Sequence, residues 1–322
     1  QFFDAEGLWQ LRQDTTGKFA GLGITVGIKD HYPVVISPIA DTPAHRAGML
    51  PGDLIVAIEG EDTFGTSLEQ VVSILRGEPG SEVRITLARL GERSRWDVVI
   101  ERQTIKIKSV AVSGQIAPGV GYISMRQTRF SEETAAEVEA ALKELIVEEA
   151  AALILDLRGN PGGVLVCAID MARYFIVEGV ITKTRGRGEP VAYERSPDDE
   201  VEPMSLPLVV LVDGGSASAS EVLAGALQDH RSAVLVGSPT FGKARVQSVR
   251  HFEDAKAIVK VTSSYYTTPS GRDLDRSPER PWGIRPDIVI ELDARTEALI
   301  HRHINRYDPP AEALDELFAW EG

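Results

Sequence analysis

The chain has 322 residues, which is long enough for two domains, and its apolar content of 43% easily supports a hydrophobic core. A formal net charge of −14 argues against nucleic acids and anionic membrane surfaces as partners. The single cysteine, Cys167, excludes an internal disulfide and a cysteine-based metal site. No run reaches transmembrane length, and no signal peptide is visible. Because Gln1-Phe2-Phe3 is not typical of a native start, we expect that a targeting segment has been removed.

Residues 1–18 are short and polar, and residues 19–102 predict a first domain of small strands with two helices. The helix at 66–75 opens on the capping box Thr66-Ser67-Leu68-Glu69. The other predicted elements of this unit are a short helix at 42–49 and strands at 21–26, 33–36, 54–58, 82–89 and 95–101.

This unit resembles a PDZ domain. The resemblance runs through Gly21-Leu22-Gly23-Ile24, the stretch 37–48, Pro51-Gly52-Asp53 and Ile58-Glu59-Gly60. In PDZ domains such a glycine-rich loop offers N–H groups to the carboxylate of a peptide C-terminus, and the peptide adds a strand to the sheet edge. The resemblance therefore implies that Gly21, Leu22, Gly23 and Ile24 form that loop. A nucleotide-binding loop is rejected because the third glycine and the downstream acidic residue are missing.

The helix at 66–75 carries Leu68 and Val72 on one face, and the resemblance implies that both line the peptide groove. Side chains of this type also fill hydrophobic cores. A purely structural role therefore stays open for both residues.

Beyond residue 103, strands alternate with longer helices. Predicted strands at 119–125, 153–157, 180–184, 208–212 and 233–236 are interleaved with helices at 131–148, 163–176 and 218–229, followed by strands at 246–251 and 257–264 and a peripheral helix at 291–321. The apolar run at 153–157 is typical of a strand that is buried on both faces. Residues 103–322 therefore predict an α/β domain with a largely parallel central sheet.

The stretch 214–221 joins the strand at 208–212 to the helix at 218–229. A tight turn here presents a serine hydroxyl and unpaired N–H groups at a helix N-terminus, which favours anions. A serine nucleophile needs both features, because the carbonyl that it attacks becomes an oxyanion. Ser218-Ala219-Ser220-Glu221 is also a capping box, so a simple helix cap is the alternative interpretation.

Three motifs resemble those of the carboxyl-terminal processing (tail-specific) serine proteases. They are Asp156-Leu157-Arg158-Gly159-Asn160-Pro161-Gly162-Gly163, Ser216-Ala217-Ser218-Ala219-Ser220-Glu221, and Thr240-Phe241-Gly242-Lys243 with Gln247. With the PDZ-like unit, the resemblance covers nearly the whole chain. It implies an α/β protease core related to ClpP and crotonase, with an inserted or preceding PDZ domain. It also implies that Ser218 is the nucleophile, Lys243 the general base and Gln247 the residue that orients the lysine.

The residues themselves support a lysine base only in part. Lys243 lies in the uncharged stretch 238–244, which fits the burial that a lysine needs to lower its pKa from about 10.4. Gln247 follows four residues later, so on an extended strand the two residues are roughly 13 Å apart, and contact requires a bend or bulge. His251 stays open as an alternative base. At the end of the helix, we expect His230 to cap the C-terminus and Asp229 to be structural.

An oxyanion hole requires backbone donors close to Ser218. The Ala219 N–H is one candidate, and the second comes from Gly162 or Gly163, between which the sequence does not decide. The alternative is an ordinary glycine-rich turn in which Arg158 is a structural ion-pair partner.

The sequence therefore predicts a Ser–Lys endopeptidase that cleaves proteins near unstructured, apolar C-terminal tails captured by the PDZ domain. No metal or cofactor is implied, an adaptor or homo-oligomer stays open, and the resemblance implies an extracytoplasmic, periplasmic location. Ala244 and Arg245 depart from the family pattern after the lysine. An inward-pointing Arg245 would block the cleft, which keeps open a catalytically impaired PDZ scaffold. A crotonase-type acyl-CoA enzyme is a further alternative, but neither a CoA pocket nor catalytic carboxylates are indicated.

Overall fold

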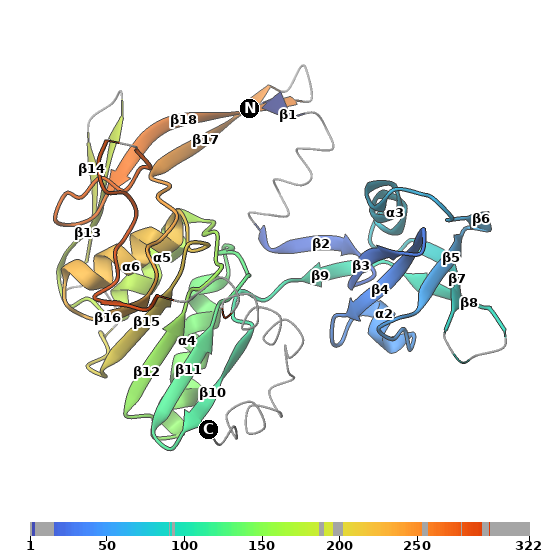
Figure 1. Ribbon diagram of the computed structural model, residues 1–322, viewed down its shortest axis with the longest axis horizontal. Helices are drawn as coiled ribbons and strands as arrows, with labels where there is room; N and C mark the ends of the chain where they lie inside the picture. Colours follow the sequence, from blue (N-terminus) through green and yellow to red (C-terminus); the bar gives the residue numbers. More distant parts are fainter. Residues whose placement is uncertain are drawn as a thin grey trace. The chain divides into compact units, whose positions relative to one another are not determined.

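The computed structural model describes residues 2–3, 16–89, 91, 94–186, 190–195, 202–252, 257–277, 279–291 and 296. The chain divides into two compact units, one of residues 18–107 and one formed by residues 1–17 and 108–322 (Figure 1). The second unit includes β1 (Phe2–Phe3), which pairs with a strand from the far end of the chain. The 18–107 unit is therefore an insertion within the larger unit.

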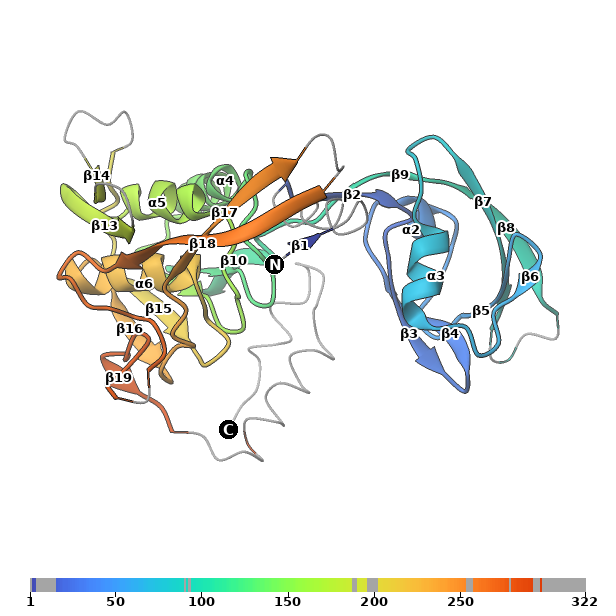
Figure 2. The ribbon, with the colours of Figure 1, turned by 90° about the horizontal axis from the view of Figure 1, so that it is seen from above.

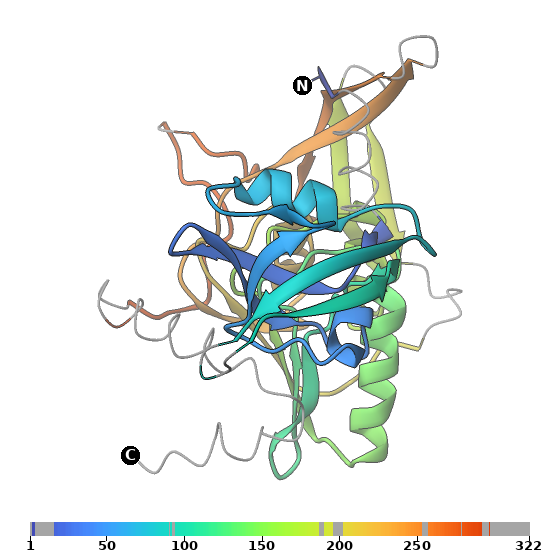
Figure 3. The ribbon, with the colours of Figure 1, turned by 90° about the vertical axis from the view of Figure 1, so that its right-hand side faces the viewer.

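The 18–107 unit is an antiparallel sheet flanked by helices. Its sheet has the order β3 (Ile24–Lys29), β4 (Tyr32–Pro38), β5 (Leu54–Ile58), β7 (Glu82–Ala88) and β8 (Trp96–Glu101), with β6 (Glu61–Asp62) paired to β5. A separate pair is formed by β2 (Lys18–Gly21) and β9 (Gln103–Lys106). The strands lie between α2 (Pro43–Arg46) and α3 (Leu68–Leu75) (Figure 3). Strand β3 is at the edge of the sheet, with β4 as its only described neighbour.

Helix α3 begins one residue later than the predicted capping box. Its N-cap is Ser67, whose hydroxyl accepts a hydrogen bond from the Gln70 N–H at 3.3 Å, so the box is formed with Gln70 and not between Thr66 and Glu69. This places Val71 and Leu75 in the core of the unit.

The larger unit contains a six-stranded sheet covered by helices. Its order is β10 (Val112–Ala117), β11 (Val120–Ser124), β12 (Ala152–Asp156), β15 (Leu208–Val212), β16 (Val234–Gly237) and β19 (Ile288–Val289), and only β10 is antiparallel to its neighbour. The helices are α4 (Thr134–Val147), α5 (Leu165–Arg173) and α6 (Ala219–Asp229). Helices α5 and α6 pack side by side (Figure 2). The prediction of an α/β domain with a largely parallel central sheet is confirmed.

A second, antiparallel sheet completes this unit. It has the order β1, β18 (Ala257–Thr267), β13 (Gly179–Gly186) and β14 (Val191–Arg195), with β17 (Arg245–Phe252) paired to β18. Helix α6 contacts both β16 and β13, so it lies between the two sheets. Strands β1, β10, β14 and β19 were not predicted from the sequence. The predicted helix at 291–321 lies outside the described residues, except for Glu291 and Thr296.

The parallel strands bury one face more fully than the other. In β15, Leu208, Val210 and Val212 are buried, whereas Val209 and Leu211 are half-buried. Because these strands run in the same direction, their carboxyl ends meet at one edge of the sheet. Both the glycine-rich segment after β12 and the Gly/Ser turn after β15 begin at that edge.

We expect Gly23→Ala to destabilise the 18–107 unit more than Gly52→Ala does. Both glycines have positive φ, +78° and +92°. Alanine in this left-handed region destabilises the folded state by about 1–2 kcal/mol at either position. At Gly23 the new Cβ would also lie 2.3 Å from Thr42 Cβ, whereas at Gly52 it would meet nothing within 4 Å. Overpacking adds about 1–3 kcal/mol.

Hydrogen exchange of amides in 18–107, measured on the full chain under native conditions, checks this difference. Equal protection in the two variants would contradict a steric requirement for glycine at position 23.

Candidate active site

The turn after β15 holds Ser218 in a strained backbone conformation. Ser218 has φ +60° and ψ −119°, is half-buried, and is the N-cap of α6. The turn is anchored by Asp213 Oδ1, which accepts hydrogen bonds from the N–H groups of Gly159 (2.8 Å), Gly215 (2.9 Å) and Ser216 (3.1 Å). A serine on such a sharp strand-to-helix turn presents its hydroxyl beyond the sheet edge, as a nucleophile requires.

A buried carboxylate fixes this turn to the segment that carries the predicted base. Glu221 is 0% exposed, and each of its oxygens accepts two hydrogen bonds. Oε2 accepts from the N–H groups of Ser218 (2.8 Å) and Lys243 (2.9 Å). Oε1 accepts from Thr240 Oγ1 (2.6 Å) and the Gly242 N–H (2.7 Å). Glu221 therefore does more than cap a helix, because it holds two distant segments together.

The Lys243 side chain is half-buried, and none of the described carboxylates forms an ion pair with it. The described side chains form no hydrogen bond between Ser218 Oγ and Lys243 Nζ. Ala244 is fully buried in the core. Arg245 does not block the lysine, because its 53% exposed side chain pairs with Asp275 at 3.1 Å.

Gln247 lies two residues into β17, and its side chain is exposed. A register shift lies between Val246 and Gln247, where a bulge or bend was required for contact with the lysine. Within the described residues, however, no hydrogen bond joins Gln247 to Lys243. Its assignment as an orienting residue stays a prediction. His251 lies further along the same strand, and its side chain is outside the described set.

Gly162, in the segment after β12, lies close to Ser218 and Ala219. A Cβ on Gly162 would lie 2.6 Å from the Ala219 nitrogen, so only glycine leaves this space open. The Gly162 N–H donates to Asn160 Oδ1 at 2.9 Å and is therefore occupied. The N–H groups of Gly163 and Ala219 donate to no acceptor among the described residues. These two N–H groups are therefore the candidate donors to an oxyanion.

Asn160 braces the glycine segment against α6. It is fully buried, and its Oδ1 also accepts a hydrogen bond from Ser220 Oγ at 2.8 Å. Its carbonyl accepts from the Ala217 N–H at 3.0 Å. The sequence motif contained Asn160, but nothing in the pattern gave it this role.

Asp229, at the far end of α6, has a structural role, as predicted. It binds Arg272 at 2.5 Å and the Ser270 N–H at 2.9 Å. Burial raises the pKa of Asp229, but hydrogen bonds from Thr268 and Ser270 together with the Arg272 charge lower it below its usual range. The prediction that His230 caps the helix is confirmed: it is the C-cap residue, and its N–H donates to the Ala226 carbonyl at 3.0 Å. Its ring also bonds the Val180 carbonyl at 2.7 Å.

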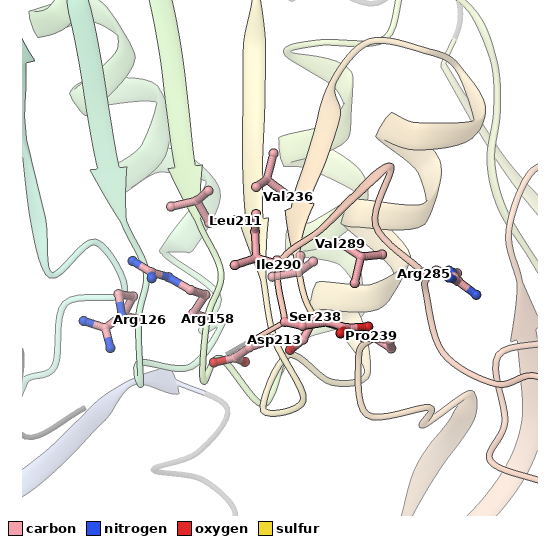
Figure 4. A pocket seen from close by; sticks show the side chains of 13 residues that line it. Arg126, Arg158, Leu211, Asp213, Val236, Ser238, Pro239, Arg285, Val289 and Ile290 are labelled. Carbon is pink, nitrogen blue, oxygen red and sulfur yellow. The ribbon is translucent and has the colours of Figure 1, made fainter. Parts of the chain in front are cut away.

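A pocket of about 660 Å³ opens at the carboxyl ends of the parallel strands (Figure 4). Arg126 and Arg158 lie on one side of it and Arg285 on the other. Its apolar wall includes Leu211 and Val236. Neither Ser218 nor Lys243, the predicted nucleophile and base, is among the residues that line this pocket.

The 18–107 unit presents a second arrangement of unpaired donors. The N–H groups of Leu22 and Gly23 donate to none of the described residues, whereas their carbonyls accept from Ala44 and Ile39. Gly21 ends β2 and Ile24 begins β3, the edge strand.

Helix α3 lies beside β3. Leu68 on this helix is 38% exposed and Val72 is half-buried, so neither side chain is fully within the core. The loop, the edge strand and these side chains have the arrangement that capture of a peptide terminus requires.

Two family models match the chain. Residues 119–290 match peptidase family S41, and residues 34–89 match the PDZ domain. The S41 match contains the Gly/Ser turn, the lysine segment and the glycine segment.

Similar proteins include a carboxy-terminal-processing protease of Bartonella bacilliformis, 38% identical over 90% of this chain and 65% of the relative. A carboxyl-terminal-processing protease of Synechocystis is also 38% identical, over 87% of this chain and 65% of the relative. Among solved structures, a photosystem II D1 C-terminal processing protease is 31% identical with a TM-score of 0.53, and covers 90% of this chain and 77% of that one.

The fold itself is also similar to that of an S41 protease structure from Bacteroides fragilis, with a TM-score of 0.58 at 18% identity over 95% of this chain and 82% of that one. The chain spans slightly less than two thirds of the length of the Bartonella and Synechocystis relatives. The predicted family, the protease core and the PDZ domain are confirmed: the chain belongs to peptidase family S41.

Proposed function

We propose that the chain is a serine endopeptidase that cleaves protein substrates near their C-termini. The observation that carries this proposal is the shared Glu221 oxygen, which holds the backbones of Ser218 and Lys243 together. The N–H groups of Ala219, which follows Ser218, and of Gly163, which follows Gly162, donate to no acceptor among the described residues. The relatives named as processing proteases support the same activity.

In the proposed reaction, the neutral Lys243 amine takes the proton of the Ser218 hydroxyl. Ser218 Oγ then forms a bond to the scissile carbonyl carbon, and the carbonyl π electrons move to its oxygen. The N–H groups of Ala219 and Gly163 stabilise this oxyanion. When the C–N bond breaks, Lys243 returns the proton to the leaving amine, and water later hydrolyses the acyl-enzyme.

The hydrogen bond between Ser218 and Lys243 forms in this scheme only when substrate is bound, as is common for catalytic hydrogen bonds. Gln247 would orient the Lys243 amine once substrate is bound. Arg245 pairs with Asp275 on the exposed side, so the feature that favoured an impaired scaffold no longer does so.

We further propose that the PDZ domain captures the substrate tail. Leu22 and Gly23 would bind the terminal carboxylate, β3 would pair with the tail, and Leu68 and Val72 would contact its apolar side chains. In the described part of the chain, no helix combines the length and apolar character needed to cross a bilayer. The extracytoplasmic location implied by the sequence resemblance stays a prediction, as do an adaptor and a homo-oligomer.

We expect Ser218→Ala and Lys243→Ala to lower the cleavage rate of an unfolded protein by about 10⁴-fold or more, because they remove the nucleophile and the base. Lys243→Arg should be equally inactive, since a guanidinium keeps the charge but cannot accept a proton at working pH. Gel-based cleavage rates with purified full chain check these variants.

Lys143→Ala is the matched control, because Lys143 lies on α4 with a 71% exposed side chain. His251→Ala should also retain activity. An active Ser218→Ala or Lys243→Arg enzyme, or an inactive His251→Ala enzyme, would contradict the proposed dyad.

Amidation of a substrate peptide's C-terminus should weaken its binding ten- to a hundredfold. The change removes the terminal charge and keeps every side chain, and charge-assisted hydrogen bonds are worth about 1.5–3 kcal/mol. Calorimetry with the Ser218→Ala full chain measures paired free-acid and amidated peptides without cleavage. Equal affinities would mean that the PDZ domain does not recognise a chain terminus.

A further inference from the structure

The pocket at the carboxyl ends of the parallel strands contains a buried guanidinium that lacks hydrogen-bond acceptors. The Arg126 side chain is 10% exposed, and its Nε is buried with no hydrogen-bond partner in the described part of the chain. Asp156 Oδ2 lies 3.7 Å from this nitrogen, which is too far for a hydrogen bond. Because arginine stays protonated in proteins, Arg126 keeps its charge despite its burial.

Asp156 does not satisfy Arg126, because other donors use both of its oxygens. Oδ2 accepts hydrogen bonds from Arg158 Nη2 at 2.6 Å and from the Tyr122 hydroxyl at 2.9 Å. Oδ1 accepts from the backbone N–H and the Nε of Arg158, at 3.0 and 2.9 Å. Arg158 therefore balances the buried Asp156 charge, and Arg126 is left as an additional cation. Burial of a charge without hydrogen bonds is costly, and an anionic ligand would supply the missing acceptors.

A second cation lies across the pocket. Arg285 is on the side opposite Arg126 and Arg158 (Figure 4), it is exposed, and its side chain forms no ion pair or hydrogen bond with any described residue. Two carboxylates also line the pocket, but Asp213 Oδ1 accepts from the N–H groups of its own turn, and Glu291 is exposed. The pocket therefore has cations on both sides that can bind an anion.

The rest of the lining is mainly apolar and includes Leu211, Val236, Val289 and Ile290. Apolar walls with a few placed cations select a ligand that combines an apolar body with an anionic group. The volume of about 660 Å³ is within the usual range of small-ligand sites. In open parallel sheets, ligands bind in this position, outside the carboxyl ends of the strands.

The pocket shares its walls with the catalytic segments. Asp213 anchors the Ser218 turn, Pro239 belongs to the loop that leads to Lys243, and both line the pocket. Arg158, which also lines it, belongs to the glycine segment. A ligand bound here would therefore contact the three segments from which the proposed catalytic site is built.

We propose that this pocket binds the C-terminal end of a peptide, with the α-carboxylate at Arg126 and the last, apolar side chain against the wall formed by Leu211, Val236 and Val289. A carboxylate accepts two N–H bonds from one guanidinium, so it matches an arginine that lacks acceptors. The choice of a peptide as ligand rests on the proposed function, because hydrolysis of the acyl-enzyme leaves a carboxylate on one product and the released tail keeps its own. The protease core would thus have a carboxylate site in addition to that of the PDZ domain.

The ¹⁵N–H resonances of the Ser218→Ala full chain test this site without cleavage. The probe is N-acetyl-leucine, which has one α-carboxylate and one apolar side chain and is too short to pair with several residues of β3. We expect the Arg126 Nε–H resonance to shift and to saturate with a Kd of about 1 mM or lower, an affinity that a ligand of this size can reach. No saturable shift at Arg126 would overturn the inference.

Ligands that carry one half of the probe show what the pocket recognises. N-acetyl-leucinamide keeps the apolar side chain and removes the charge, whereas acetate keeps the charge and removes the side chain. We expect each to bind at least about tenfold more weakly, since charge-assisted hydrogen bonds and apolar burial each contribute a factor of that size. Acetate or inorganic phosphate that binds as tightly as N-acetyl-leucine would identify a site for small anions and overturn the assignment to a peptide end. Equal binding of N-acetyl-leucinamide would overturn the role of the arginine.

Arg126→Met removes the guanidinium and keeps a side chain that fills much of the same space. Binding of N-acetyl-leucine, followed at the backbone amides of Val236 and Ile290, should weaken by about ten- to a hundredfold. The melting temperature should be unchanged or raised, because the variant removes a buried cation without acceptors. Arg185→Met is the matched control, since Arg185 is exposed on β13 and does not line the pocket. Unchanged binding in Arg126→Met, or an equal loss in Arg185→Met, would overturn the inference.

The two proposals fail separately. If the Ser218→Ala chain still cleaves an unfolded protein, the proposed function fails. If that chain is inactive and the Arg126 resonance does not respond to N-acetyl-leucine, only the carboxylate site is refuted. The resonance measurement retains Arg126, so it decides the inference even when Arg126→Met does not fold.

Discussion

The buried carboxylate of Glu221 is the constraint on which the catalytic arrangement depends. Removing a carboxylate from water is costly unless its lone pairs are satisfied, and here four donors from two separate segments satisfy them. The Ser218 turn and the segment 240–243 can therefore reach their lowest free energy only together. The cost of burying the charge thus makes the two halves of the site interdependent.

The fold brings these segments to the same place. Parallel β12 and β15 end at one sheet edge, so the glycine segment and the Gly/Ser turn start side by side. Asp213 and Asn160 then connect them, through the Gly159 N–H and the Ser220 hydroxyl respectively. The antiparallel sheet contributes Tyr266 from the other side of the lysine segment. Both sheets are therefore needed to hold one serine and one lysine.

Much of this arrangement could be predicted from local patterns, because the relevant signals lie within a few residues of each other. The apolar run at 208–212, the Gly/Ser turn and the helical spacing after it correctly predicted β15, the turn and α6. The S-x-x-E box also identified Glu221, but only as a cap, since its bonds to Gly242 and Lys243 span more than twenty residues.

Other features depend on tertiary contacts that leave no mark in the sequence. That the Asn160 side chain accepts a hydrogen bond from the Gly162 N–H could not be read from the motif, so the motif provided no reason to prefer Gly163 over Gly162 as a candidate donor. The contact of Tyr266 with the Lys243 carbonyl also had no signal in the sequence, because an aromatic residue in a strand is ordinary core. The outward direction of Arg245 depends on Asp275, thirty residues away. Strands β14 and β19 are short, and each is recognisable as a strand only from its pairing with a neighbouring strand.

The cleavage rate of the Glu221→Gln full chain tests most directly whether this carboxylate assembles the site. Glu139→Gln is the control, because Glu139 lies on α4 with a 42% exposed side chain. Glutamine has nearly the same shape as glutamate. In either orientation of its amide, however, the NH₂ group faces two hydrogen-bond donors, so the two hydrogen bonds that one carboxylate oxygen accepts in Glu221 are lost. We expect cleavage to fall by about a hundredfold or more while the chain stays folded by circular dichroism. A folded Glu221→Gln enzyme with the activity of the Glu139→Gln control would contradict the view that Glu221 holds nucleophile and base together.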